Sequence, residues 1–119
     1  MKKILYVDDA QSMRKLVNLV LSSEFDITMA ENGLLGYEAA QKQVFDVIIS
    51  DINMPVMSGL ELLEKLRQHP NSQFTPILML TTEASAELKA KGKQLGATGW
   101  IVKPFDPEKL ASAINRLIP

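Results

Sequence analysis

The sequence contains no cysteine and only one histidine among its 119 residues. Disulfides and thiolate metal sites are therefore excluded, and a reducing compartment such as the cytoplasm is where we expect this protein. The single histidine, His69, directly precedes Pro70. We expect it in a surface loop and not as a phosphate donor.

Long apolar runs and an excess of charge of either sign are also missing. No stretch is long enough to cross a bilayer, so we expect a soluble protein without membrane insertion. The short apolar run at residues 4–7 follows Lys2 and Lys3 but ends in two acids, unlike a signal peptide. The formal net charge is -1, which gives no reason to expect nucleic-acid binding.

Low-complexity segments, internal repeats and linkers are absent as well. Gly33 and Gly36 do not form a phosphate-binding loop, because the Walker pattern with its lysine is missing. The hydrophobic fraction of 46% is normal for a globular protein. We therefore expect residues 1–119 to form a single domain.

Short apolar segments alternate five times with segments of helical periodicity. Strands are predicted at residues 4–7, 27–30, 45–50, 76–80 and 100–102. Helices are predicted at about residues 13–22, 33–42, 58–69, 85–95 and 107–118. This alternation predicts a parallel sheet covered by helices on both faces, although it does not fix the strand order.

Asp51 ends an apolar, β-branched run at residues 47–49, and Pro55 follows soon after. Proline cannot continue a central ladder, so the strand is expected to stop near Asp51. In open α/β sheets the carboxyl ends of the parallel strands form one edge, and chemistry is usually found there. An isolated aspartate in such a place is more often a turn residue.

Polar side chains from four strand ends are expected at that same edge: Asp8, Asp9, Asp51, Thr81 and Lys103. Clustered acids repel one another, and Mg²⁺ offsets such charge while keeping positions for water and phosphate oxygens. An amine and a hydroxyl would complete a pocket for a phosphoryl group. Aspartate is a recognised nucleophile for that group.

Each of these residues also has a simpler structural explanation. Asp9 could cap the first helix, Thr81 could end a strand, and Lys103 could be an ordinary surface lysine. Only their convergence on one edge favours a functional site, since the structural roles give no reason for it.

The chain resembles the receiver domains of two-component response regulators, most closely the single-domain chemotaxis regulators of the CheY type. The resemblance covers essentially the whole chain. The motifs that carry it are Val7-Asp8-Asp9, Asp51-Ile52-Asn53-Met54-Pro55, Gly59, Leu80-Thr81, Gly96-Ala97-Thr98-Gly99-Trp100 and Lys103-Pro104-Phe105. It implies a flavodoxin-like (βα)5 sandwich of three layers, with a parallel five-stranded sheet in the order 2-1-3-4-5.

The resemblance also implies a phosphoacceptor and a metal site. Asp51 is expected to take a phosphoryl group from a phosphohistidine on a sensor histidine kinase. Mg²⁺ would be held by Asp8, Asp9 and Asp51 together with the backbone carbonyl of Asn53. The protein would then be a regulator that assists its own phosphorylation and dephosphorylation, and not an enzyme.

Two further pairs of residues take roles by the same resemblance. Lys103 would pair with the phosphoryl oxygens, directed by a cis peptide bond to Pro104. Thr81 would move toward a phosphorylated Asp51, and the ring of Trp100 would turn inward to fill the vacated space. Tyrosine or phenylalanine is commoner at that position, so a tryptophan that simply packs at a strand edge is the structural alternative.

Phosphorylation is expected to shift the fourth helix, fifth strand and fifth helix between two arrangements. Lys89, Lys91 and Trp100 are predicted on that partner face. Asn53 and Glu83 flank the path of the attacking water in this family, which predicts a short-lived phosphoryl group. The expected partners are a sensor histidine kinase, a flagellar motor switch protein and a phosphatase, and the chain is expected to act as a monomer.

Other functions stay open from the sequence. A haloacid-dehalogenase-like phosphatase also uses a strand-end aspartate beside Mg²⁺, but it usually has a second acid where this chain has Asn53. A phosphorelay shuttle or another stand-alone receiver would keep the same side chains. An interaction module that no longer takes phosphate, or a piece of a longer transcription factor, are the remaining alternatives.

Overall fold

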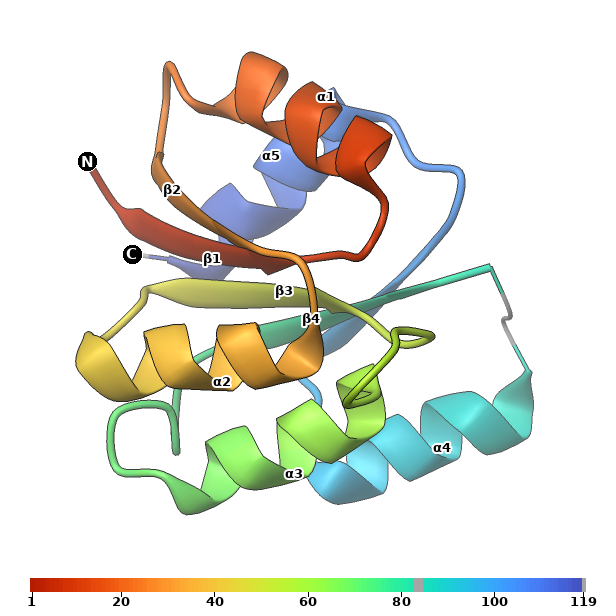
Figure 1. Cartoon of the computed structure of the whole chain (residues 1–119). Coiled ribbons are helices and arrows are strands. Elements are labelled where there is room, and N and C mark those ends of the chain that lie inside the picture. Colours follow the sequence, from red (N-terminus) through yellow and green to blue (C-terminus); the bar gives the residue numbers. More distant parts are fainter. Residues whose placement is uncertain (83–84, 119) are drawn as a thin grey trace.

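The computed structural model describes residues 1–82 and 85–118 (Figure 1). Within these residues, strands and helices alternate as β1 (Lys3–Val7), α1 (Gln11–Leu21), β2 (Asp26–Ala30), α2 (Gly33–Lys42), β3 (Val47–Asp51), α3 (Gly59–Gln68), β4 (Ile77–Thr81), α4 (Ala86–Leu95), β5 (Gly99–Val102) and α5 (Pro107–Leu117). Every predicted element is therefore present, with its ends shifted by at most a few residues. No helix in the described part of the chain is long and apolar enough to span a membrane.

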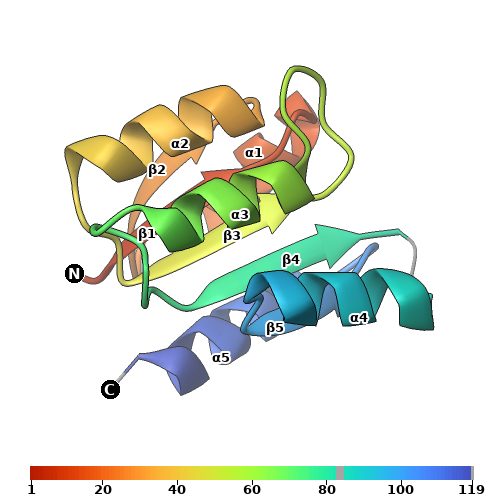
Figure 2. The same cartoon turned by 90° about the horizontal axis from the view of Figure 1, so that it is seen from below.

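The strands form one parallel sheet in the order β2-β1-β3-β4-β5. This confirms the strand order that the resemblance implies. Helices α1 and α5 cover one face of the sheet, and α2, α3 and α4 cover the other (Figures 1 and 2). The result is the expected three-layer flavodoxin-like sandwich, in which the carboxyl ends of all strands lie on one edge.

Strand β1 shows how the sheet divides the core. Leu5 and Val7 pack into the cluster beneath α2, α3 and α4, whereas Ile4 and Tyr6 pack into the cluster beneath α1 and α5. All four side chains are buried. A central parallel strand must be apolar on both faces, which explains why the run is continuous and not alternating.

Helix ends follow the capping residues in the sequence. The side chains of Asn32, Ser58, Ser85 and Asp106 each accept a hydrogen bond from a backbone N–H group in the first turn of the following helix. Gly96 ends α4 in the left-handed conformation, with φ at 104°. These local signals mark where α2, α3, α4 and α5 begin and where α4 stops.

Arg67 of α3 holds the edge of the sheet opposite to those carboxyl ends. Its guanidinium donates to the Gly96 carbonyl from Nε (3.0 Å) and Nη2 (2.8 Å), and from Nη1 to the carbonyls of Ser72 (2.9 Å) and Thr75 (2.7 Å). Burial of the guanidinium lowers the pKa of Arg67 from its ordinary value. The side chain thus joins the α3–β4 connection to the α4–β5 connection, and we call this arrangement the Arg67 clasp.

Replacing Arg67 with methionine is expected to lower the free energy of unfolding by about 3 kcal/mol. The carbonyl groups of the clasp would lose a charged donor, and one hydrogen bond to a charged group contributes about 1.5–3 kcal/mol. Urea unfolding of the variant measures this loss. Arg116, an exposed arginine in the last turn of α5, provides the matched control, because Arg116→Met should change stability by only about 0.5 kcal/mol. Equal losses in the two variants would contradict a structural role for the clasp.

Candidate functional site

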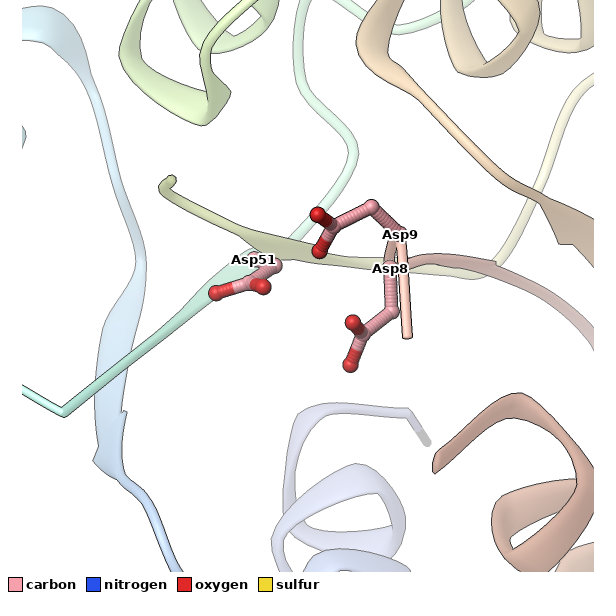
Figure 3. A group of neighbouring side chains, drawn as sticks. All are labelled: Asp8, Asp9 and Asp51. Atoms are coloured by element: carbon pink, nitrogen blue, oxygen red, sulfur yellow. The ribbon is translucent and has the colours of Figure 1, made fainter. Parts of the chain in front are cut away.

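Three carboxylates gather where β1 and β3 end (Figure 3). Asp8 and Asp9 follow β1, and Asp51 is the last residue of β3. Each of the three side chains offers an oxygen, and these oxygens all lie within 4.8 Å of one another. The structure therefore brings together the acids that the sequence placed at one edge, in an arrangement that suits a hard cation.

Lys103 directly follows the carboxyl end of β5, and its side chain reaches two of the three carboxylates. Its backbone N–H donates to the carbonyl of Thr81 at 2.7 Å, which sets it beside the end of β4. Its Nζ atom lies 3.1 Å from Oδ2 of Asp51 and 3.2 Å from Oδ2 of Asp8. The peptide bond between Lys103 and Pro104 is cis, as the resemblance implies. The carboxylates of Asp8 and Asp51, which are far apart in the sequence, thus both contact the Lys103 ammonium group.

Burial makes the negative charge of this site costly. Asp8 is fully buried and Asp51 is 8% exposed. Burial raises the pKa of Asp51 above its ordinary value, the hydrogen bond and charge of Lys103 lower it in part, and the charge of Asp8 raises it again. Because two carboxylates share the Lys103 ammonium, an additional cation would relieve the remaining repulsion.

The Lys103 ammonium keeps its proton in this setting. Burial alone would lower the pKa of Lys103, but the hydrogen bond to Asp51 and the charges of Asp8 and Asp51 outweigh it, so its pKa is raised above the ordinary value. At neutral pH the side chain is therefore a permanent positive charge at the carboxyl edge of the sheet.

Tyr6 contacts the site in a way that the sequence analysis missed. Its hydroxyl donates a hydrogen bond to Oδ2 of Asp8 at 2.8 Å, and both residues are fully buried. Burial, followed by the charge of Asp8, raises the pKa of the Tyr6 phenol above its ordinary value. Residues two apart on a strand share a face, so the spacing of Tyr6 and Asp8 was the available signal.

Asp9 does not cap the first helix, so that structural alternative is wrong. The N-cap residue of α1 is Ala10, which has no side-chain capping bond. Instead Oδ1 of Asp8 accepts a hydrogen bond from the Ala10 N–H at 3.0 Å. Asp9 is exposed, and its carboxylate remains part of the acidic group.

The sequence matches the family described as the response regulator receiver domain over residues 4–115. The chain belongs to this family. The receiver domain is the signalling module of two-component response regulators, and the predicted family is confirmed.

Known proteins similar to this receiver domain include a chemotaxis protein, a sensor histidine kinase and a probable transcriptional regulator. The structure of the Vibrio cholerae chemotaxis protein CheY4 is 49% identical with a TM-score of 0.94, and the match covers 99% of each chain. The receiver domain of the Pseudomonas aeruginosa sensor histidine kinase PA1611 is 26% identical with a TM-score of 0.89, over 98% of this chain and 96% of that one. The probable transcriptional regulator ycf29 of Porphyra purpurea is 38% identical over 115 residues, or 97% of this chain and 55% of that protein. The chain thus spans about half the length of ycf29.

The residues of the expected switch lie on two neighbouring strands, β4 and β5. Thr81 is buried at the end of β4, and Trp100 is half-buried in β5. The tryptophan ring packs against Gly92 of α4, where a Cβ atom would lie only 2.5 Å from Cζ3 of the ring. Its Nε1 is buried and has no hydrogen-bond partner within the described residues. The receiver domain therefore accommodates a tryptophan because α4 has a glycine opposite it.

Three other predicted functional residues, Asn53, Lys89 and Lys91, lie in exposed positions of the described chain. Asn53 is exposed in the connection after β3, and Glu83 lies outside the described residues. Lys89 and Lys91 are exposed on α4. Lys89 and Trp100 line the same cavity of about 250 Å³, so these two residues share a surface.

Proposed function

We propose that this receiver domain accepts a phosphoryl group on Asp51 from a phosphohistidine of a sensor histidine kinase, in a reaction that requires Mg²⁺. The position of Lys103 is the observation that supports this most directly, because its ammonium is within 3.2 Å of both Asp8 and Asp51. A fixed cation beside the acceptor carboxylate can stabilise the charge of phosphoryl oxygens.

Asp8, Asp9 and Asp51 would hold the Mg²⁺ ion, with the backbone carbonyl of Asn53 as a further ligand. Carboxylates, carbonyls and waters are the oxygen ligands that this ion prefers. The PA1611 receiver domain has a magnesium ion coordinated in its active site cleft, which supports the same metal here. When bound, Mg²⁺ would neutralise carboxylate charge and contact a phosphoryl oxygen.

In the transfer, an Asp51 oxygen would form a bond to phosphorus while the bond from phosphorus to the histidine nitrogen breaks. The electron pair of the broken bond returns to the imidazole of the donor. Lys103 stays protonated and exchanges its contact with Asp51 for one with the phosphoryl oxygens. The Thr81 hydroxyl would supply a second donor to that group.

Acetyl phosphate provides a direct test of this function. With Mg²⁺ present, the protein should gain the mass of one phosphoryl group on the peptide that contains Asp51. Chelation of Mg²⁺ with EDTA should prevent the gain. An unmodified protein in the presence of both acetyl phosphate and Mg²⁺ would contradict the proposed function.

The surface formed by α4, β5 and α5 is the proposed docking face for a target. The cavity of about 250 Å³ on it is lined by Lys89, Lys93 and Trp100 among others, which suits a segment with acidic and apolar side chains. CheY4 is named a chemotaxis protein, which supports a flagellar motor switch protein as target and a phosphatase as a second partner. A pull-down with and without beryllofluoride distinguishes this output from a phosphorelay shuttle, which would capture only a phosphotransfer protein.

Gly92→Ala is expected to displace the Trp100 ring from α4. The added Cβ would lie 2.5 Å from a ring carbon, closer than atoms that are not bonded to each other can approach. Trp100 is the only tryptophan in the chain, so its fluorescence reports on this ring alone. We expect a red-shifted emission and stronger quenching by iodide. The exposed neighbour Lys91 gives a control, since Lys91→Ala should leave the emission unchanged, and an unchanged emission in Gly92→Ala would show that the ring does not depend on the glycine.

A further inference from the structure

The Tyr6 hydroxyl is a polar group buried beneath the acidic site. The ring packs into the cluster beneath α1 and α5, yet its hydroxyl donates to Oδ2 of Asp8 at 2.8 Å. Tyr6 and Asp8 both have no exposed surface. A buried hydroxyl needs a partner, and a buried carboxylate needs several.

The hydrogen bonds of Asp8 divide its two oxygens into different roles. Oδ2 accepts from Tyr6 at 2.8 Å and from Lys103 at 3.2 Å, while Oδ1 accepts from the Ala10 N–H at 3.0 Å. A carboxylate has about four positions for hydrogen bonds, two on each oxygen. Oδ2 is therefore fully used, and Oδ1 keeps one position for a cation or one of its waters.

Lys103 cannot be the permanent partner of Asp8 in this chemistry. Its Nζ also lies 3.1 Å from Asp51, and under the proposed function it turns to the phosphoryl group. Asp8 would then keep the Tyr6 hydroxyl and the Ala10 N–H as its donors. A buried carboxylate with one donor fewer would be free to rotate or to repel the other acids.

The geometry points to Tyr6 as a positioning residue that fixes the Asp8 carboxylate for Mg²⁺ binding. This inference rests on the proposed function, because it concerns the same metal site. The hydroxyl holds Oδ2 in place whether or not Lys103 is engaged, so Oδ1 keeps its free position for the ion or one of its waters. Groups that hold a metal ligand in this way commonly change metal affinity or activity ten- to hundred-fold when they are removed.

Tyr6→Phe tests this role because it keeps the packed ring and removes only the hydroxyl. Titration calorimetry with MgCl₂ should show about ten-fold weaker binding to the variant than to the wild-type protein. The matched control is Tyr37→Phe, since Tyr37 lies on α2 with its ring against His69, away from the acids. This control should bind Mg²⁺ as the wild-type protein does.

Phosphorylation by acetyl phosphate separates positioning from a general loss of structure. The Mg²⁺ concentration for half-maximal phosphorylation of Tyr6→Phe should rise about ten-fold, in step with its binding constant, while the rate at saturating Mg²⁺ recovers to near the wild-type rate. If the variant is less stable, the rise of its melting temperature with MgCl₂ still reports the affinity of its folded state.

The outcomes also separate this inference from the proposed function. A wild-type protein that binds no Mg²⁺ would overturn the proposed function and this inference with it. A wild-type protein that binds Mg²⁺, with Tyr6→Phe binding it equally or more tightly, would overturn the role of Tyr6 alone. Weaker binding by both Tyr6→Phe and Tyr37→Phe would also overturn it, because the effect would not be specific to the hydroxyl on Asp8.

Discussion

Asp51→Asn is expected to abolish phosphoryl acceptance and, without Mg²⁺, to make the folded protein more stable. The amide has nearly the same shape but no nucleophilic oxygen of comparable strength. Burial and the charge of Asp8 raise the pKa of Asp51, so the ionised side chain opposes folding. Asparagine removes that charge, and we expect a gain in the free energy of unfolding on the order of 1 kcal/mol at neutral pH.

The pH dependence of this gain has a defined sign. A carboxyl whose pKa is raised on folding contributes favourably below its unfolded-state pKa, near its ordinary value of 3.8. That contribution is lost as the pH rises from the unfolded-state value through the folded-state value, because over this interval the unfolded state has already released the proton that the folded state still binds. The stability difference between Asp51→Asn and the wild-type protein should therefore widen as the pH rises from 4 to 7.

Urea unfolding across this pH range measures the effect, with intact-protein mass as the readout for phosphorylation. Asp26, an exposed aspartate at the start of β2, gives the matched control, since Asp26→Asn should change the free energy of unfolding by at most about 0.5 kcal/mol and should still be phosphorylated. Added Mg²⁺ should stabilise the wild-type protein more than Asp51→Asn. A destabilised or still phosphorylated Asp51→Asn protein would refute this account of the acceptor.

Lys103→Met is expected to slow phosphorylation by acetyl phosphate at least about 100-fold at saturating Mg²⁺. Removing one donor aimed at developing charge commonly costs about 2.7–4 kcal/mol in the transition state. Methionine keeps much of the length of the side chain but carries no charge. Mg²⁺ binding should persist or become tighter, because the ammonium no longer competes with the ion for Asp8 and Asp51.

Stopped-flow phosphorylation kinetics and MgCl₂ titration separate these two effects. Lys109→Met, which alters an exposed lysine on α5, removes the same charge away from the acids and should leave both quantities unchanged. Circular dichroism should confirm that Lys103→Met remains folded, since Asp8 loses a partner. A rate within about three-fold of the wild-type protein, where the expected loss is some 100-fold, would show that Lys103 does not act on the phosphoryl group.

The sequence was sufficient to predict the elements and the edge where the acids meet. Continuous apolar runs identify strands buried on both faces, and capping residues such as Asn32 and Ser58 mark where helices begin. Every parallel strand has its carboxyl end on the same edge of the sheet. Asp51 and Lys103 could therefore be placed together although they lie 52 positions apart in the sequence. Alternation alone could not give the strand order, which came from the resemblance.

The interactions that the sequence did not reveal depend on distances across the fold. Tyr6 looks like a core residue in an apolar strand, and its two-residue spacing from Asp8 hints at a shared face but does not reveal the hydrogen bond between them. Arg67 has the pattern of a helix-surface residue, yet it binds the carbonyl of Gly96, which is 29 positions away. Gly92 and Trp100 are likewise paired only by the packing of α4 on β5. The contacts of Arg67 and of Gly92 follow from tertiary structure and have no local sequence pattern.

The Arg67 clasp holds one end of α4. The carbonyl of Gly96, directly after the helix, is bound to α3 through two hydrogen bonds, whereas the first turn lies near the edge of the sheet that contains Asp51 (Figure 1). The C-terminal end of α4 is thus anchored to α3 through the Gly96 carbonyl. We therefore expect any displacement of α4 on phosphorylation to be largest at Ala86, beside the acidic edge, and smallest at Gly96.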